Sequence, residues 1–230
     1  MAPGKELNFF IGADEPPGID PEEWWRHGQW HRGLDWYRCQ FDGNAPVRGE
    51  SSPGYTDPAH PEAAQRIHDV VPQARLIYLV REPLERAISQ WWHHVRDGTE
   101  LRPMEEALLD PDSQYVARSR YVERMVPFLD LFPAEQLLVV VQERLRDDGD
   151  RTIRRVLNHI GADPDRWTSL GAASPSRAPG KQISKQISSD LAREFAGRVA
   201  DDLDALRHWM GEEVPEWDSG PAAQALARNR

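Results

Sequence analysis

Arg81 and Ser89 lie eight positions apart, where an apolar segment meets a helical one. Residues 75–80 read Arg-Leu-Ile-Tyr-Leu-Val, a run typical of a parallel strand covered on both faces. Ligands of open α/β sheets bind beyond the carboxyl ends of the strands, so a guanidinium and a hydroxyl there would suit a phosphate monoester. The plainer alternative is that Arg81 pairs with Glu82 or Glu85 and that Ser89 merely packs. The corner alone does not decide between the two.

Strand-like and helix-like segments alternate along the rest of the chain. Residues 137–141 predict a second buried strand, residues 6–10 could form another, and residues 47–50 resemble a strand end. Helical spacing of apolar residues predicts a helix start at 20–25, a short helix or turn over 33–41, and helices over 58–71, 84–96, 104–109, 119–128, 150–160 and 189–210. This order predicts the α/β class, a three-layer sandwich around a mainly parallel sheet without internal repeats.

Composition limits the partners and the location. The formal net charge of −10 argues against nucleic acid as a partner, and it means that an anionic ligand needs a local basic pocket. Cys39 is the only cysteine, so no intramolecular disulfide can form and a cytoplasmic location is expected. No apolar run approaches the ~18 residues of a membrane span and no leader is visible, so no membrane partner is expected. We expect one domain over residues 1–217 and a disordered tail over 218–230, and the oligomeric state stays open.

Several segments share their order with one enzyme family. The corner fits the pattern strand-Arg-x-Pro-x-x-Arg-Ala-x-Ser, and the other segments are Lys5-Glu6-Leu7-Asn8-Phe9-Phe10, Gly33-Leu34-Asp35-Trp36-Tyr37, Gly49-Glu50-Ser51-Ser52-Pro53-Gly54-Tyr55, Ser119-Arg120-Tyr121, Phe132-Pro133-Ala134-Glu135-Gln136-Leu137-Leu138 and Asp147-Asp148. Together they resemble sulfotransferases that use 3′-phosphoadenosine-5′-phosphosulfate (PAPS). The resemblance spans about residues 5–165 and is closest to the heparan-sulfate-type and bacterial members. It implies a P-loop nucleotide-hydrolase-like sulfotransferase fold.

The resemblance also implies roles around the cofactor. Arg81 and Ser89 would hold the 3′-phosphate of PAPS, and Glu6 would be the general base that takes the proton of the acceptor. Lys181 would close over the nucleotide, although a solvated loop lysine is the alternative. Tyr121 would contact the phosphate or the adenine, with packing against the sheet as its alternative. No metal is expected, because sulfate carries less charge than phosphate and no histidine pair has zinc-ligand spacing.

The acceptor side is expected to include Asn8, Trp36, Glu50, Ser51 and Ser52. Aromatic side chains such as Trp36 stack on sugars or flat apolar rings, although core packing is the commoner use of a Trp. Asn8 stands where the family commonly has a His, and Ser51 stands where the heparan-type enzymes carry a Lys. Both departures, with the acidic surface, put a polyanionic acceptor in doubt.

One expected element is missing from the sequence. The family begins with a phosphate loop, strand-Lys-x-Gly-Thr/Ser-Thr/Ser, which holds the 5′-phosphosulfate, and no Gly-x-x-x-x-Gly-Lys-Ser/Thr or shorter relative is found in the chain. Three explanations for the missing loop are open: a start site placed too late or a fragment, a chain that has lost sulfuryl transfer and only binds, and completion by another chain. The leading hypothesis is an enzyme that moves a sulfuryl group from PAPS to a hydroxyl or amine of a carbohydrate, lipid or small metabolite. The alternatives are an impaired or inactive PAPS-binding protein and, third, a kinase-like phosphotransferase, which would need that loop and a magnesium carboxylate.

Overall fold

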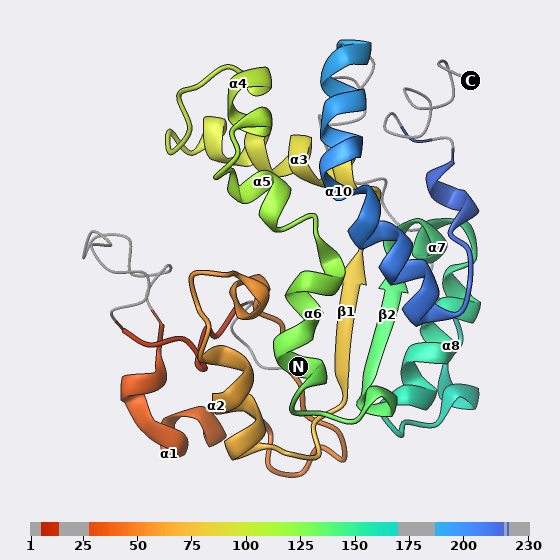
Figure 1. Ribbon diagram of the computed structural model, residues 1–230. Coiled ribbons are helices and arrows are strands. Elements are labelled where there is room, and N and C mark those ends of the chain that lie inside the picture. The colour runs from red at the N-terminus through yellow and green to blue at the C-terminus, as the bar shows by residue number, and fades with distance from the viewer. Residues whose placement is uncertain (1–5, 14–27, 170–186, 219, 221–230) are drawn as a thin grey trace. The chain divides into compact units, whose positions relative to one another are not determined.

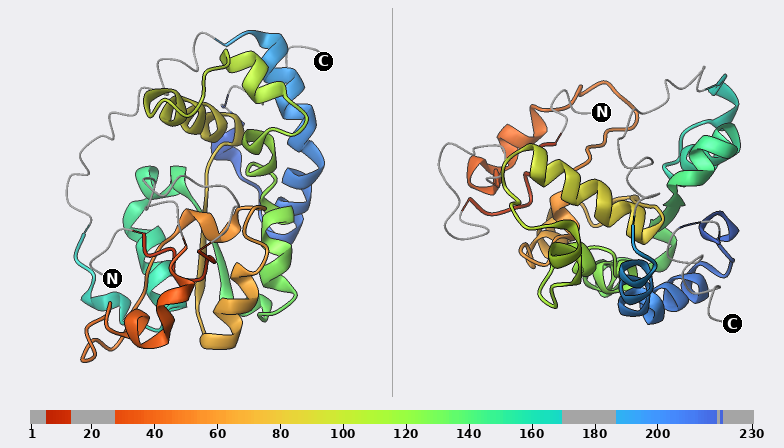
Figure 2. Two further views of the ribbon diagram at one scale, coloured as in Figure 1. Left: turned by 90° about the vertical axis from the view of Figure 1, so that its left-hand side faces the viewer. Right: turned by 90° about the horizontal axis from the view of Figure 1, so that it is seen from above.

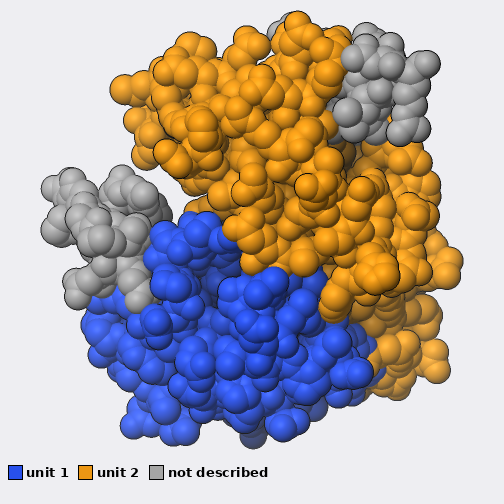
Figure 3. All heavy atoms as spheres, in the orientation of Figure 1, with its two compact units in different colours: residues 1–76, 124–137, 159–162 blue, residues 77–123, 138–158, 163–230 orange. Residues whose placement is uncertain are grey.

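The computed structural model describes residues 6–13, 28–169, 187–218 and 220. The helix start expected at 20–25, Lys181 with the loop around it, and nearly all of the expected tail lie outside these residues. The chain divides into two compact units, coloured separately in Figure 3: unit 1 comprises residues 1–76, 124–137 and 159–162, and unit 2 comprises residues 77–123, 138–158 and 163–230.

Two strands form the sheet of the described residues. β1 (Leu76–Val80) and β2 (Leu137–Val141) are neighbours and run in the same direction (Figure 1), which confirms the α/β class. All five residues of β2 are buried. β1 alternates instead, with Ile77 and Leu79 exposed, so the expected covering of both faces holds for β2 and is wrong for β1.

Helices pack into one apolar cluster in unit 2. The helices α3 (Pro83–Arg96), α4 (Met104–Leu109), α5 (Gln114–Ala117) and α10 (Ser189–Met210) supply its side chains, and α10 packs against the other three. Figures 1 and 2 show the long α10 running past the end of α3. Leu191, Phe195 and Val199 repeat every four residues and form one buried face. The Ser188 hydroxyl accepts from the Leu191 amide at the start of α10, and Gly211, with φ of 66°, ends it.

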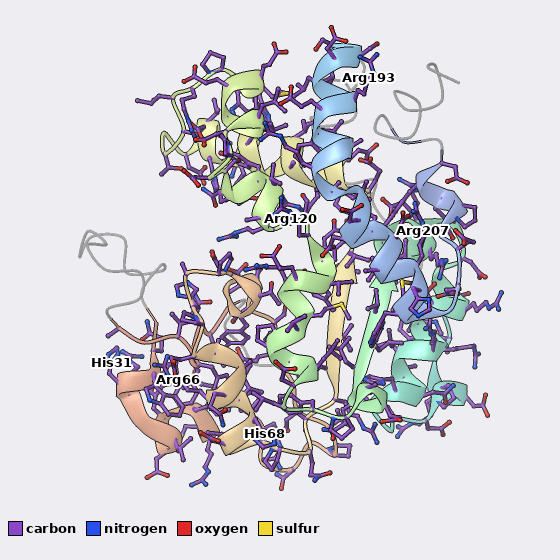
Figure 4. The ribbon with its side chains drawn as sticks, in the orientation of Figure 1. His31, Arg66, His68, Arg120, Arg193 and Arg207 are labelled. Carbon is purple, nitrogen blue, oxygen red and sulfur yellow. The ribbon has the colours of Figure 1, made fainter. Side chains whose placement is uncertain are left out.

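Unit 1 is built around aromatic side chains. The Phe9 ring stacks on Tyr37 with centroids 4.3 Å apart, and Phe10 contacts Tyr55 at 5.6 Å. Arg66, labelled in Figure 4, donates from Nη1 to the Phe10 carbonyl at 3.2 Å. The helices nearby in sequence are α1 (Gly33–Arg38) and α2 (Ala63–Val70), the latter shorter than the expected 58–71.

Residues 6–10 and 47–50 are not strands, and both expectations are wrong. Asn8 has φ of 48°, in the left-handed region, which interrupts an extended backbone. Its carbonyl accepts from the Gln29 amide at 2.9 Å and its amide donates to Ser52 Oγ at 3.0 Å, so tertiary partners replace a sheet ladder.

The remaining helices flank the strands in sequence. They are α6 (Tyr121–Leu129), α7 (Gln142–Asp147) and α8 (Gly149–His159). The short 3₁₀ helices are Trp30–Arg32, Pro53–Thr56, Ala134–Gln136, Pro164–Arg166 and Pro215–Trp217.

Candidate functional site

The corner between β1 and α3 is rigidly capped. Pro83 is the first residue of α3, where its missing amide hydrogen costs nothing. The carboxylate of Glu82 accepts from the Glu85 amide at 2.6 Å and so caps the helix. Arg81 therefore lies between the end of β1 and the Glu82 cap of a fixed helix start.

Glu85 and Ser89 lie one turn apart on α3, and the side chain of Arg81, just before the helix, contacts Glu85, so the three side chains form one stripe. The Arg81 guanidinium donates to Glu85 Oε2 at 3.1 Å, and both side chains are about a quarter exposed, 24% and 25%. This ion pair is the plainer alternative considered for Arg81. It uses one of the five N–H donors of a guanidinium, and no other partner of this group is recorded among the described residues. Ser89 is half-buried, and no hydrogen bond of its hydroxyl to another described residue is recorded.

Tyr121 packs instead of facing outward. It is 2% exposed, and its hydroxyl donates to the Arg81 carbonyl at 2.7 Å. Burial raises the pKa of Tyr121 above its usual value, which keeps the hydroxyl a donor. In the structure Tyr121 is thus a packed residue, which was the alternative to its expected contact with the cofactor. Its hydroxyl contacts the backbone of Arg81.

Arg86 places a half-buried positive charge in the same helix. Its Nε donates to Ser119 Oγ at 2.9 Å, its Nη1 donates to Gln90 Oε1 at 2.6 Å, and its Nη2 donates to the Tyr115 carbonyl. These three acceptors are uncharged, so they satisfy the donors without neutralising the cation. Burial lowers the pKa of Arg86, although the guanidinium stays charged at any ordinary pH. The sequence pattern contained Arg86 without assigning it a role.

The expected general base lies in unit 1. Glu6 is exposed and is followed by buried Leu7 and by Asn8 in its left-handed turn. A bulky buried residue and two backbone hydrogen bonds of Asn8 thus fix the segment directly behind the carboxylate.

Glu50, Ser52 and Asn8 belong to one hydrogen-bonded network in unit 1. Ser52 Oγ accepts from the Asn8 amide and donates to Glu50 Oε2 at 3.2 Å, and the Tyr55 hydroxyl donates to the same oxygen at 2.9 Å. Burial raises the pKa of the Glu50 carboxyl, and the Tyr37 hydroxyl beside it counteracts this rise. The pKa values of Tyr37 and Tyr55 are raised, by burial first and then by the charge of Glu50.

The remaining acceptor-side candidates differ in exposure. Ser51 is exposed, while Ser52 is buried, so only Ser51 of this pair presents its side chain to solvent. Trp36 is half-buried, its ring centroid lies 6.0 Å from that of Phe9, and the guanidinium carbon of Arg32 lies 4.7 Å from it. The structure therefore brings Asn8, Glu50 and Ser52 together, and Trp36 adjoins them through the aromatic core.

The described residues contain no group of three or more His, Cys, Asp and Glu side chains arranged to hold a metal ion. No helix in this part of the chain is long and apolar enough to span a membrane.

Known proteins similar to this chain share the expected activity. A family model described as "Sulfotransferase family" matches residues 20–167, more than half of the 230 residues. Mouse heparan sulfate glucosamine 3-O-sulfotransferase 3B1 is 29% identical over 142 residues, which cover 57% of this chain and 36% of that protein. Human bifunctional heparan sulfate N-deacetylase/N-sulfotransferase 3 is 23% identical over 255 residues, covering 91% of this chain and 28% of that protein. The chain thus spans well under half the length of these two relatives.

A solved structure extends the comparison to the fold. The crystal structure of a sulfotransferase from Alicyclobacillus acidocaldarius superimposes with a TM-score of 0.72 and 26% sequence identity, covering 94% of this chain and 87% of that one. The similarity confirms the expected sulfotransferase fold, and together with the family match it shows that the chain belongs to the sulfotransferase family.

Proposed function

We propose that this protein transfers a sulfuryl group from PAPS to a hydroxyl or amine of a carbohydrate, lipid or small metabolite. The observation that carries the proposal is the stripe of Arg81, Glu85 and Ser89 at the carboxyl end of β1, within the segment that the family model matches. Arg81 keeps donors to spare and is partly exposed, so it fits a phosphate monoester.

Three side chains of unit 2 would recognise the 3′-phosphate. Arg81 donates to the phosphate oxygens, and Ser89, one helical turn beyond Glu85, supplies a hydroxyl. Arg86 adds positive potential near the start of the same helix, because its half-buried charge has only uncharged acceptors. The three residues therefore attract a dianion in a protein whose net charge is −10.

The reaction is a substitution at sulfur. A lone pair of the acceptor oxygen or nitrogen forms the new bond to sulfur while the bond from sulfur to the 5′-phosphate oxygen breaks. The electron pair leaves with that oxygen and gives adenosine 3′,5′-bisphosphate. Glu6 takes the proton of the acceptor as the bond forms and returns it to water, which reaches this exposed carboxylate. A positioned general base contributes about 10²–10⁴-fold to such a step.

The acceptor side favours a carbohydrate or another acceptor of low negative charge. The two relatives above carry heparan sulfate in their names, which supports a carbohydrate. Ser51 is exposed and uncharged where heparan-type enzymes carry a Lys, and Asn8 is likewise uncharged. These side chains supply hydrogen bonds without the positive charge that a highly sulfated chain would require.

Transfer of ³⁵S from labelled PAPS to a panel of glucosamine oligosaccharides, with and without existing sulfates, tests the proposal. The wild type should label an acceptor and release adenosine 3′,5′-bisphosphate, whereas Glu6→Gln should lower the transfer rate by about 10²-fold or more with unchanged binding of the bisphosphate. Glu135→Gln, at another exposed glutamate of unit 1, is the matched control and should behave like the wild type. Binding without any transfer would support the binding-only alternative, and absence of both would refute the proposal.

A further inference from the structure

The peptide bond between Arg81 and Glu82 is held from both of its polar atoms by side chains. The Arg81 carbonyl accepts from the Tyr121 hydroxyl at 2.7 Å, and the Glu82 amide donates to Glu143 Oε1 at 3.0 Å. Strand β1 ends at Val80, so no sheet ladder fixes this peptide. Its orientation depends on two side chains that are far away in sequence.

Trp217 completes this arrangement from the end of the described chain. Its indole Nε1 donates to Glu143 Oε2 at 3.1 Å, and its ring centroid lies 6.1 Å from that of Tyr121. Trp217 is 3% exposed, and the family match ends fifty residues earlier, at residue 167. The buried carboxylate of Glu143 thus has a donor on each oxygen.

The segment that carries Trp217 is anchored beside the same glutamate. Arg144 donates from Nη1 to Glu212 at 2.7 Å, from Nε to Glu216 at 2.8 Å and from Nη2 to the Glu213 carbonyl at 3.0 Å. Adjacent residues of α7 therefore hold the segment and its tryptophan, which keeps the indole in register with Glu143.

We infer that Tyr121, Glu143 and Trp217 are positioning residues for Arg81, a peptide clamp that aims its guanidinium at the 3′-phosphate. The inference rests on the proposed function, because it assigns the clamp to the anion site of that reaction. A buried carbonyl or amide left without its partner destabilises the fold, so the intact clamp resists rotation of the peptide. Rotation of this peptide would turn the Cα–Cβ bond of Arg81 and carry its guanidinium away from Glu85 and Ser89.

The test compares affinities for adenosine 3′,5′-bisphosphate and for adenosine 5′-monophosphate by calorimetry on the whole chain. Tyr121→Phe and Trp217→Phe each keep an aromatic ring and remove one donor. Each should weaken binding of the bisphosphate by roughly 5- to 20-fold and leave the monophosphate nearly unchanged, since only the former has the group that Arg81 recognises. Trp167→Phe, which removes an indole hydrogen bond to Asp150 at 3.2 Å elsewhere in unit 2, is the matched control and should bind both nucleotides like the wild type.

A double-mutant cycle with Arg81→Ala separates positioning from a general loss of stability. If the clamp acts through Arg81, Trp217→Phe should have no further effect on bisphosphate affinity once Arg81 is alanine. Equal weakening in both backgrounds, or wild-type affinity in a folded Trp217→Phe protein, overturns the inference. Should Trp217→Phe fail to fold, the same cycle with Glu143→Gln decides the matter. Failure of the wild type to bind the bisphosphate would instead refute the proposed function.

Discussion

Glu85 occupies the position between the two side chains that would hold the 3′-phosphate. It pairs with Arg81 at 3.1 Å, and Ser89 follows one helical turn later. A phosphate dianion placed between Arg81 and Ser89 would compete with Glu85 for the guanidinium and would be repelled by its carboxylate. Glu85→Gln removes the charge and keeps the shape, so we expect it to tighten binding of adenosine 3′,5′-bisphosphate.

The magnitude follows from charge and exposure. Two charges about 6 Å apart at an effective dielectric of roughly 40, between protein surface and water, interact by about 1.4 kcal/mol per unit of phosphate charge. Glu85→Gln also loses a partly exposed ion pair that helps to order Arg81, and this loss reduces the gain in binding free energy by about 0.3–0.5 kcal/mol. After further offset by reorganisation of Arg81, we expect a net gain of about 1–2 kcal/mol, or roughly 5- to 30-fold tighter binding.

Calorimetric titration of the variant and of Glu194→Gln measures this effect. Glu194 forms an ion pair with Arg198 on α10 with the same four-residue spacing, at 2.7 Å, which makes Glu194→Gln a matched control without an effect on affinity. The gain should shrink in high salt, because the carboxylate is partly exposed. Weaker binding by Glu85→Gln would show that the ion pair prepares Arg81 for the ligand, and the reasoning would be wrong.

Three further predictions concern stability, measured as the free energy of unfolding in urea. The pKa of Glu100 is lowered to about 2, chiefly because the Arg102 side chain donates hydrogen bonds to its carboxylate. The ionised carboxylate therefore stabilises the fold above the unfolded pKa of about 4.3, and this contribution is lost as the pH falls toward 2. Glu100→Gln should accordingly be less stable than the wild type at pH 7, and the two stabilities should converge near pH 2. Asn8→Val should lose about 1–2 kcal/mol because φ is 48°, whereas Asn8→Gly should lose much less, and equal losses would contradict the argument from backbone strain. Phe195→Ala should lose about 3–5 kcal/mol from the core of unit 2, and a loss below about 1 kcal/mol would contradict the packing described.

The regular elements could be predicted where local pattern and capping agree. The bounds of α10 match the expectation because the four-residue repeat runs from a serine cap to a glycine in the left-handed region. The bounds of β2 match the expectation because five consecutive apolar residues can all be buried in one strand. Residues 6–10 have a similar apolar content, but the turn at Asn8 depends on Gln29 and Ser52, which no local pattern reveals.

The candidate site likewise has one part that the sequence predicts and another part that depends on tertiary structure. The sequence pattern predicts Arg81 and Ser89 at one strand-to-helix corner, and the four-residue spacing of Glu85 and Ser89 places these two on one face of α3. The partners that fix the corner come from distant segments: Glu143 lies 61 residues from Glu82, and Trp217 lies a further 74 residues away. Only tertiary structure brings them together, so neither could be assigned from the sequence.

Recognition of the ribose 3′-phosphate by Arg81 underlies both the proposed transfer reaction and the peptide clamp. Titration of the wild type and of Arg81→Ala with adenosine 3′,5′-bisphosphate and adenosine 5′-monophosphate measures it. We predict that the wild type prefers the bisphosphate by about tenfold or more, the value of one charge-assisted contact, and that Arg81→Ala removes most of this preference, leaving only the smaller part that Ser89 and Arg86 supply. Equal affinity of the wild type for both nucleotides, or an undiminished preference in Arg81→Ala, would contradict this assignment.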